Sequence, residues 1–290
     1  MGFLILNKPA GMTSHDCVAR IRRRYGLRRV GHGGTLDPAV TGVLPLALGP
    51  ATRLLPYLEG SKRYDGVIQL GVRTSTDDLE GEVLTTSPVP TLSTTAIEEL
   101  LAPFRGEILQ RPPQVSAVHV QGERAYARAR RGETMELTAR PVTVECLELT
   151  AWDEERQQLH LSVTCSAGTY IRSLARDLGE QLGCGGSLAR LRRSGALGFT
   201  LDDSISLEEL DQTPLPEPIP ALRALKHLSC HQLAEDDWTS WRCGRVLSDP
   251  QGRPAETAVV ILGPDGNLAG MARATGEGLL QPKLVFDAAG

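Results

Sequence analysis

Asp37 is the residue whose surroundings in the sequence most favour chemistry. It precedes Pro38, follows His32 by five positions and lies in the glycine- and proline-rich stretch 31–49. An Asp before Pro commonly forms a turn in which its carboxylate bonds nearby backbone. A carboxylate held in a shaped loop can also attack a carbon atom or stabilise positive charge that develops there. The residues around Asp37 leave both interpretations open.

Several familiar catalytic arrangements are absent from the sequence. There is no G-x-x-x-x-G-K-[ST] phosphate loop, no G-x-S-x-G nucleophile elbow and no H-E-x-x-H zinc helix. The glycine groups at 31–34 and 183–186 do not match the dinucleotide-binding pattern and indicate tight turns. The six cysteines never form a C-x-x-C pair, so neither a disulfide framework nor a zinc ribbon is predicted. We therefore expect reduced thiols, no metal and no cofactor.

Length and composition describe an ordinary globular protein. The 290 residues are 41% hydrophobic and 23% charged, which suffices for one large domain and a smaller one. No apolar run approaches the roughly 18 residues of a membrane-spanning helix, and the N-terminus lacks the features of a secretory signal. These features predict a soluble cytoplasmic protein.

Charge is distributed unevenly along the chain. Residues 1–200 hold 24 Lys and Arg against 21 Asp and Glu, a net charge of +3, whereas residues 201–290 hold 7 against 14, a net charge of −7. Of the 31 basic residues 27 are Arg, which suits forked contacts to phosphate and stacking on bases. The overall charge of −4 therefore does not exclude a nucleic-acid-binding face.

The densest arginine group is predicted on a helix near the N-terminus. Thr13 or Ser14 caps this helix, Gly26 ends it, and its apolar face is predicted to hold Cys17, Val18, Ile21 and Tyr25. The other side carries Arg20, Arg22, Arg23 and Arg24, with Arg28 and Arg29 just beyond. Such a surface is typical either of a solvated helix or of an RNA-binding face.

The remaining patterns predict a mixture of strands and helices. Residues 31–49 are expected to form an irregular, buried loop because they combine many Gly and Pro with apolar residues. The proline-rich segment 213–220 is predicted to be a linker before a small β-rich module of about 65 residues. Strands are expected at 3–6, 64–70, 142–149, 159–165, 258–263 and 268–273, and helices at 93–101 and from the 166–168 turn to Gly183.

Three separated motifs of the sequence resemble the same protein family. The segments VGHGGTLDPAVTGVLPLALGPATR (30–53), KRYDGVIQLGVRTSTDDLEG (62–81) and GTYIRSLARDLGEQLGCGG (168–186) closely resemble, in order, the TruB family of tRNA pseudouridine-55 synthases, in its bacterial type. The opening ILNKPAGMTSHDCV and the central RPPQVSAVHVQGERAYARARRG (111–132) are similar to the same family. The tail resembles its C-terminal PUA-like RNA-binding domain.

The resemblance implies a role for each matching position. Asp37 falls on the essential aspartate of the family, Tyr64 on the tyrosine of its K-R-Y motif, and Tyr170 and Arg172 on its T-Y-I-R motif. Asp78 matches the acidic residue that pairs with the arginine, His32 the histidine that holds the substrate loop open, and Leu191 an apolar pocket residue. The sequence departs from the common pattern at Gly33, where many members carry Thr, and at His119, where Lys is common.

The implied reaction breaks the bond between ribose and uracil nitrogen, turns the base and rejoins it through carbon. Asp37 would act at the sugar, Arg172 would orient it, and Asp78 would position Arg172. Either Tyr64 or Tyr170 would handle the proton, and the choice between attack at the sugar and a glycal route stays open. Phosphate contacts are expected from Arg20, Arg22, Arg23, Arg24, Arg124, Arg128, Arg130 and Arg131.

The resemblance also implies an architecture and a partner. We expect an α+β fold, with a large mixed and mainly antiparallel sheet flanked by helices in a catalytic domain at 1–220 and a small β-rich domain at 221–290. A thumb-like RNA-binding insertion is expected at about 111–141. The expected substrate is the T-arm stem-loop of tRNA, bound by a monomer without a membrane or an obligatory protein partner. The alternatives are an RNA-folding protein whose catalysis is secondary, and a guide-dependent enzyme acting on ribosomal RNA.

Overall fold

A large mixed sheet forms most of the structure, a computed structural model that describes residues 2–116, 118–120, 122–129 and 131–286. Its main strand order is β14-β1-β3-β12-β4-β11-β10-β7, with β2, β13 and β15 attached beside this path. All pairings are antiparallel except β1 with β14 and β12 with β3. These strands are β1 (Gly2–Lys8), β2 (Val30–His32), β3 (Thr41–Leu48), β4 (Lys62–Leu70), β7 (Gly106–Gln110), β10 (Arg140–Asp153), β11 (Gln158–Cys165), β12 (Gly186–Ala196), β13 (Phe199–Thr200), β14 (Ser204–Ile205) and β15 (Ile219–Pro220).

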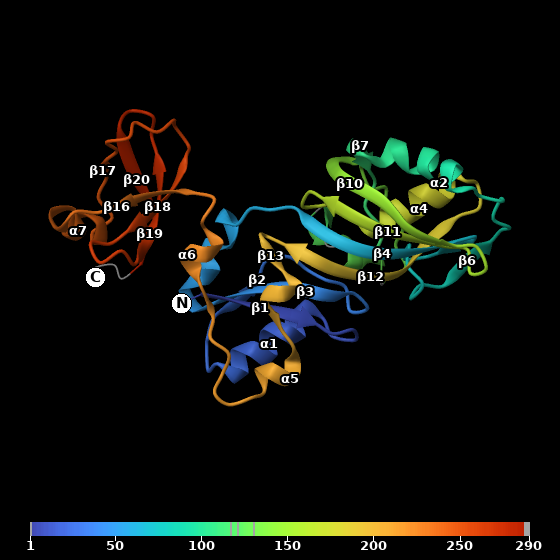
Figure 1. The fold of residues 1–290 in the computed structure, drawn as a ribbon, viewed down its shortest axis with the longest axis horizontal. Helices are drawn as coiled ribbons and strands as arrows, with labels where there is room; N and C mark the ends of the chain where they lie inside the picture. The colour runs from blue at the N-terminus through green and yellow to red at the C-terminus, as the bar shows by residue number, and fades with distance from the viewer. Residues whose placement is uncertain (1, 117, 121, 130, 287–290) are drawn as a thin grey trace.

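The main helices pack on one face of this sheet (Figure 1). α1 runs over Ser14–Arg24 and is capped by Thr13, whose hydroxyl accepts a hydrogen bond from Asp16 N–H while the Asp16 carboxylate accepts one from Thr13 N–H. Apolar residues of α1, α2 and α4 fill one continuous core with the sheet. The other helical segments are short. The helices are α2 (Thr94–Leu101), α3 (Ala125–Ala129), α4 (Ile171–Gln181), α5 (Leu207–Leu210), α6 (Ala221–Ala224) and α7 (Glu235–Arg242), with 3₁₀ turns η1 (Gly49–Tyr57), η2 (Ala102–Phe104) and η3 (Leu201–Asp203).

A second sheet lies beyond α6 at the C-terminal end of the described chain (Figure 1). Its strand order is β16-β18-β19-β20-β17. The two sheets share an apolar cluster, in which Phe3 and Phe199 of the large sheet lie with Met271 of the second sheet and with Phe286, which follows β20. Arg53 also lies over the Phe286 ring, at 5.6 Å from its centroid. The strands are β16 (Ser229–Gln232), β17 (Leu247–Ser248), β18 (Ala258–Leu262), β19 (Leu268–Ala274) and β20 (Leu279–Val285).

Two small hairpins project from the large sheet. One consists of β5 (Val72–Thr74) and β6 (Val83–Thr86), and the other of β8 (His119–Val120) and β9 (Glu123–Arg124). The second hairpin belongs to the segment between β7 and β10, which has its own small apolar cluster of Ala125, Met135 and Leu137. A separate cluster of this kind allows the segment to keep its shape with few contacts to the main core.

The expected α+β fold with a large, mainly antiparallel sheet is confirmed, and so are most of the predicted elements. The prediction of an irregular loop throughout 31–49 was wrong, because 41–48 form β3, a central strand. Gly42 and Pro45 favoured a loop in the sequence-based prediction, because both residue types are uncommon inside strands. Pro45 lies opposite Ile5 in the β1 ladder, and its carbonyl accepts a hydrogen bond from Gly33 N–H. Gly42 packs against Arg193 of β12 so closely that a Cβ would lie 2.2 Å from the Arg193 carbonyl oxygen.

Candidate active site

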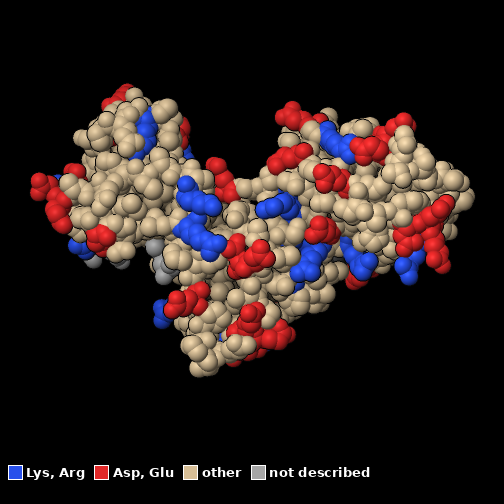
Figure 2. All heavy atoms as spheres, viewed as in Figure 1, with Lys and Arg blue, Asp and Glu red and all other residues tan. Residues whose placement is uncertain are grey.

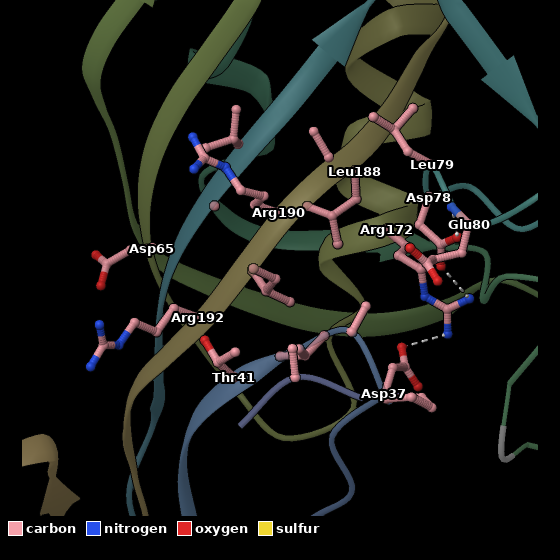
Figure 3. Close-up of a pocket in the computed structure, with 18 of the residues that line it drawn as sticks. Asp37, Thr41, Asp65, Asp78, Leu79, Glu80, Arg172, Leu188, Arg190 and Arg192 are labelled. Atoms are coloured by element: carbon pink, nitrogen blue, oxygen red, sulfur yellow. Dashed lines mark hydrogen bonds and ion pairs between the residues drawn. The ribbon is translucent and has the colours of Figure 1, made fainter. Parts of the chain in front are cut away.

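Asp37 lies in the loop between β2 and β3 and lines a cleft of about 730 Å³. Its side chain is 47% exposed, whereas that of Arg172 is only 8% exposed, and Arg172 Nη2 lies 3.0 Å from Asp37 Oδ2. The guanidinium therefore holds the carboxylate from the protein side while the carboxylate itself faces the cleft (Figure 3). A charge-assisted contact of this length fixes the orientation of the carboxylate.

Arg172 is itself held by several acceptors. It follows the N-cap residue Tyr170 by two positions, in the first turn of α4. Its Nη1 donates to Thr76 O at 3.0 Å and lies 3.6 Å from Asp78 Oδ2, and its Nη2 donates to Val115 O at 2.9 Å. The Asp78 carboxylate also accepts hydrogen bonds from Thr76 Oγ1 and Glu80 N–H. Because its donors are occupied on several sides, the guanidinium has little freedom to turn away from Asp37.

Buried side chains fix the loop on both sides of Asp37. Lys8 is fully buried, and its Nζ donates to Pro38 O at 3.0 Å as well as to Pro9 O and Met12 O. Ser14 Oγ donates to Leu36 O and accepts from Leu36 N–H. Burial lowers the pKa of Lys8, while the Cys17 thiol and Asp37 oppose this shift.

Arg193 anchors the part of the loop that precedes Asp37. It is fully buried in β12, and it donates from Nε to Val43 O at 2.8 Å, from Nη2 to Gly34 O at 3.2 Å and from Nη1 to Thr35 O at 3.4 Å. Its guanidinium also lies near the hydroxyl of Tyr64. Burial lowers the pKa of Arg193, and Tyr64 opposes this shift. The catalytic candidate thus lies on a loop whose carbonyls are held by two buried cations.

The two tyrosines lie next to this loop rather than in the wall of the cleft. Tyr64 is 6% exposed and belongs to the core, with its hydroxyl near Arg193. Burial raises the pKa of both Tyr64 and Tyr170. Tyr170 is half-buried, and its backbone N–H and carbonyl are both bonded by the side-chain amide of Gln110.

His32 and Leu191 belong to different strands, β2 and β12. His32 Nδ1 accepts a hydrogen bond from Gly34 N–H at 3.3 Å, and its ring meets His15 edge-on at 5.7 Å. Burial lowers the pKa of His32, with His15 and Arg193 adding to this effect, which favours the neutral ring. Leu191 lines the cleft beside Gly66, where a Cβ would lie 3.4 Å from Leu191 Cδ1.

The neighbourhood of Gly33 explains why this position holds Gly and not the Thr of the common family pattern. A Cβ at this position would lie 2.4 Å from Leu197 Cδ1, so the leucine side chain occupies the space that a larger residue would need. His119 lies in β8 and is not among the residues that line the cleft.

The predicted phosphate-binding arginines fall into two classes. Arg22, Arg23, Arg28 and Arg29 are exposed. Arg20 instead pairs with Asp211, and Arg24 donates to the carbonyls of Leu210, Asp211 and Gln212. In the insertion, Arg128 pairs with Glu133, and Arg131 with Glu123 and Glu133, while Arg124 is exposed in β9. Arg130 lies outside the described residues.

Further polar residues of the cleft were not singled out from the sequence. Asp65, Arg190 and Arg192 line the end of the cleft opposite Asp37 and Arg172 (Figure 3). On the face shown in Figure 2, Lys and Arg side chains lie across the middle of the molecule, interspersed with acidic side chains. Strand alternation could have identified Arg192 and Arg193 as pointing to opposite faces of a central strand, one of them inward.

The structure gives no metal-binding group within the part of the chain that it describes, where no three His, Cys, Asp or Glu side chains lie together suitably. None of the described helices is both long enough and apolar enough to cross a membrane. The cleft is lined by carboxylate, guanidinium and apolar side chains, and the two phenols lie beside the loop that carries Asp37.

Comparison with known proteins places these observations in a family. Residues 22–171 match the model "TruB family pseudouridylate synthase (N terminal domain)", and residues 172–218 match "tRNA pseudouridylate synthase B C-terminal domain". The chain is 63% identical over 289 residues to "tRNA pseudouridine synthase B" of Parasynechococcus marenigrum (strain WH8102), covering 100% of the chain and 98% of that relative. It is 57% identical over 298 residues to the protein of that name in Synechococcus sp. (strain WH7803), covering 100% and 99%.

Solved structures share the fold. A chain in "Crystal Structure of a Cbf5-Nop10-Gar1 Complex" superposes with a TM-score of 0.73 at 27% identity, over 98% of this chain and 84% of that chain. A chain in "Structure of H/ACA RNP bound to a substrate RNA containing 2'-deoxyuridine" also gives a TM-score of 0.73, at 25% identity and the same coverage.

Proposed function

The chain belongs to the TruB family of pseudouridylate synthases, and from this premise we propose that it converts the uridine at position 55, in the T-arm loop of tRNA, to pseudouridine. It is a tRNA pseudouridine synthase by its similarity, over its whole length, to relatives of that name. The specificity for the T-arm and the role of each residue are parts of the proposal. The observation that carries it is the half-exposed carboxylate of Asp37 held by the buried guanidinium of Arg172.

Asp37 acts at the ribose carbon. Breaking the bond between this carbon and the uracil nitrogen develops positive charge on the sugar, and a nearby carboxylate stabilises that charge or bonds to the carbon. The Asp37 carboxylate is suited to this because it faces the cleft. No redox change or energy source is required, since substrate and product are isomers.

Arg172 and Asp78 keep Asp37 in place. The paired guanidinium favours the ionised, correctly turned carboxylate, and Asp78 holds the other side of the guanidinium. An uncharged residue at 172 would release Asp37 and leave the Thr76 and Val115 carbonyls without their donor.

The target uridine has to leave the stacked loop before it can reach Asp37. Extrusion costs about a few kcal/mol, which contacts in the pocket must offset. Leu191 gives the flipped base an apolar contact, Tyr64 and Tyr170 support the pocket and one of them handles the proton, and His32 fills the space that the base leaves in the RNA. The neutral state that burial favours for His32 suits insertion among bases.

The RNA outside the pocket binds to basic side chains. The exposed arginines of α1 and the following loop, together with Arg190 and Arg192 of the cleft, contact phosphates and read the folded shape of the T-arm. The segment 111–141 acts as a thumb over the RNA, and residues 221–290 act as a PUA-like RNA-binding domain. We further propose that a cytoplasmic monomer suffices, without a guide RNA or protein partner.

The test is tritium release from tRNA labelled at uracil carbon 5, with the modified position mapped by carbodiimide treatment and primer extension. Asp37→Asn should lower the rate by about 10³-fold or more while tRNA binding persists. Asp65→Asn is the matched control, because it removes one carboxylate charge from the same cleft at a distance from Arg172. It should retain the chemistry and alter mainly tRNA affinity.

Three outcomes would contradict parts of the proposal. Normal release by Asp37→Asn would remove this residue from the reaction. Modification at a position other than 55 would refute the T-arm assignment. Tritium release only after addition of a guide RNA or other proteins would favour the guide-dependent alternative, and tRNA annealing that is independent of Asp37 would support an additional RNA-folding role.

A further inference from the structure

A second arginine of α4 makes contacts that parallel those of Arg172. Arg176 lies one helical turn further along, on the same face of the helix. Its Nη1 donates to Asp77 Oδ2 at 3.1 Å, next in sequence to the Asp78 that pairs with Arg172. Two consecutive aspartates are thus held by two arginines at a spacing of four residues. Both side chains of the second pair are largely buried, with 16% of Arg176 and 17% of Asp77 exposed.

The backbone at Asp77 depends on this environment. Its φ is 61°, in the left-handed region that non-glycine residues seldom adopt. Its carbonyl accepts a hydrogen bond from Leu188 N–H at 2.9 Å, and Leu79 N–H donates to Leu188 O. The turn that presents Asp78 is therefore held to β12 by backbone bonds and to α4 by the Asp77 side chain.

The same two arginines also hold the beginning of the 111–141 insertion. Arg172 donates to Val115 O at 2.9 Å, and Arg176 Nη2 donates to Arg111 O at 2.9 Å. Ser173 Oγ donates to Arg111 O as well, at 2.8 Å. The helix thus holds the 76–78 turn and the start of the insertion together.

We propose that Arg176 and Asp77 form a positioning pair for the reaction. The pair fixes the turn that carries Asp78, and through Asp78 it aligns the Arg172 guanidinium with Asp37. Neither residue is among those that line the cleft, so the pair acts only through its neighbours. This inference rests on the proposed catalytic role of Asp37.

The reason is geometric. Asp78 lies 3.6 Å from Arg172 Nη1, a contact that a small movement of the turn would break. When the Asp77 carboxylate is removed, the left-handed turn loses one of its attachments to α4, and the buried Arg176 loses one of its two carboxylate partners, Asp77 and Asp177. Misplacement of a catalytic group by about 1 Å can cost about 100-fold in rate.

Asp77→Asn is the principal test, because Asn tolerates a positive φ and the substitution removes only the charge. We expect the single-turnover rate at saturating tRNA to fall by about 10-fold, with tRNA affinity within about 2-fold of wild type. Arg176→Met breaks the pair from the other side and should give a similar or larger loss. The matched control is Asp177→Asn, which removes the other carboxylate bound to Arg176 and should change the rate by less than about 2-fold.

A double-mutant cycle separates positioning from general loss of structure. If Asp77 acts through Asp78, the effects of Asp77→Asn and Asp78→Asn will not multiply, and the double variant will be little slower than Asp78→Asn alone. The proposal is overturned if the effects multiply, if both Asp77→Asn and Arg176→Met keep the full rate, or if only tRNA affinity changes. Thermal unfolding of each variant verifies that the measured protein is folded.

Failure of this inference is distinguishable from failure of the proposed function. The wild-type and Asp37→Asn proteins decide whether the enzyme makes pseudouridine by means of Asp37. The Asp77 and Arg176 variants are interpreted only against a wild type that passes that test.

Discussion

Arginines in two regions of the molecule have different environments. Arg172 and Arg193 contact the loop that carries Asp37, and Arg176 contacts the neighbouring 76–78 turn. All three are largely or fully buried and donate to specific carbonyls or carboxylates. Arg22 and Arg23 of α1 are exposed, and their side chains make no hydrogen bond or ion pair to the part of the chain that the structure describes. Buried guanidinium groups fix geometry because leaving their partners unmatched is costly, whereas exposed ones contribute mainly long-range attraction.

The difference shows that arginine content alone does not measure RNA binding. On α1 itself, Arg20 and Arg24 are engaged with residues 210–212, while Arg22 and Arg23 point to solvent. A single helix therefore contains both classes. Separate substitution of the engaged and of the exposed arginines tests this difference directly.

The largest expected effect comes from Arg193. Arg193→Met removes the donor for three backbone carbonyls in a buried site. We expect the free energy of unfolding to fall by about 3 to 5 kcal/mol and pseudouridine formation to fall with it. Urea unfolding at low temperature, followed by the tritium-release assay, measures both.

The neighbouring Arg192→Met is the matched control for stability. Arg192 is exposed on the same strand, so its replacement should change the free energy of unfolding by no more than about 0.5 kcal/mol. Equal destabilisation by the two substitutions would show that the burial of Arg193 is not the cause of the decrease in unfolding free energy. Arg193→Lys should lie between wild type and Arg193→Met, since one ammonium cannot replace the forked donor.

The sequence predicted the local elements well because their signals are local. Thr13 caps α1 as predicted, the helix expected at 93–101 forms over Thr94–Leu101, and the strands expected at 142–149 and 159–165 are present in β10 and β11, which pair with each other. β3 was missed because its glycine and proline are tolerated only through packing against β12 and β2, which short-range patterns do not reveal.

The site was predicted through the motifs rather than through local physics. The approach of Asp37 to Arg172 joins residues 135 positions apart, and only the family resemblance brought them together. The supporting roles of Lys8 and Arg193 were not predicted, because a lysine in a short strand or an arginine in an L-R-R run is typical of an exposed residue. Their burial follows from the strand order β1-β3-β12, which places both beneath the same loop.

An intermediate effect is expected from the exposed arginines. Arg22→Gln/Arg23→Gln should raise the KM for tRNA by about 3- to 10-fold at low salt and leave kcat unchanged, because these side chains attract phosphate without touching Asp37. The slope of log affinity against log salt should become shallower by about 1 to 2.

The control is Arg20→Gln/Arg24→Gln, which removes the same charge from the same helix. Because these two side chains bind residues 210–212, their replacement should lower thermal stability and change the salt slope less. If both double variants change the salt slope equally, the division into engaged and exposed arginines is wrong for this helix.

The smallest expected effect is a decrease in the free energy of unfolding at acid pH, caused by protonation of His32. Burial, with His15 and Arg193 nearby, lowers the pKa of His32 in the folded protein below its ordinary value of 6.5. His32 therefore binds a proton more readily in the unfolded chain than in the folded protein. The stability that depends on neutral His32 is fully present at pH 8 and is lost progressively as the pH falls below 6.5. His32→Gln should reduce the loss of unfolding free energy between pH 8 and pH 5.5, as measured by urea titration. The exposed His227, replaced by Gln, controls for the loss of a histidine, and identical pH dependence in wild type and His32→Gln would show that the His32 ring does not resist protonation in the folded protein.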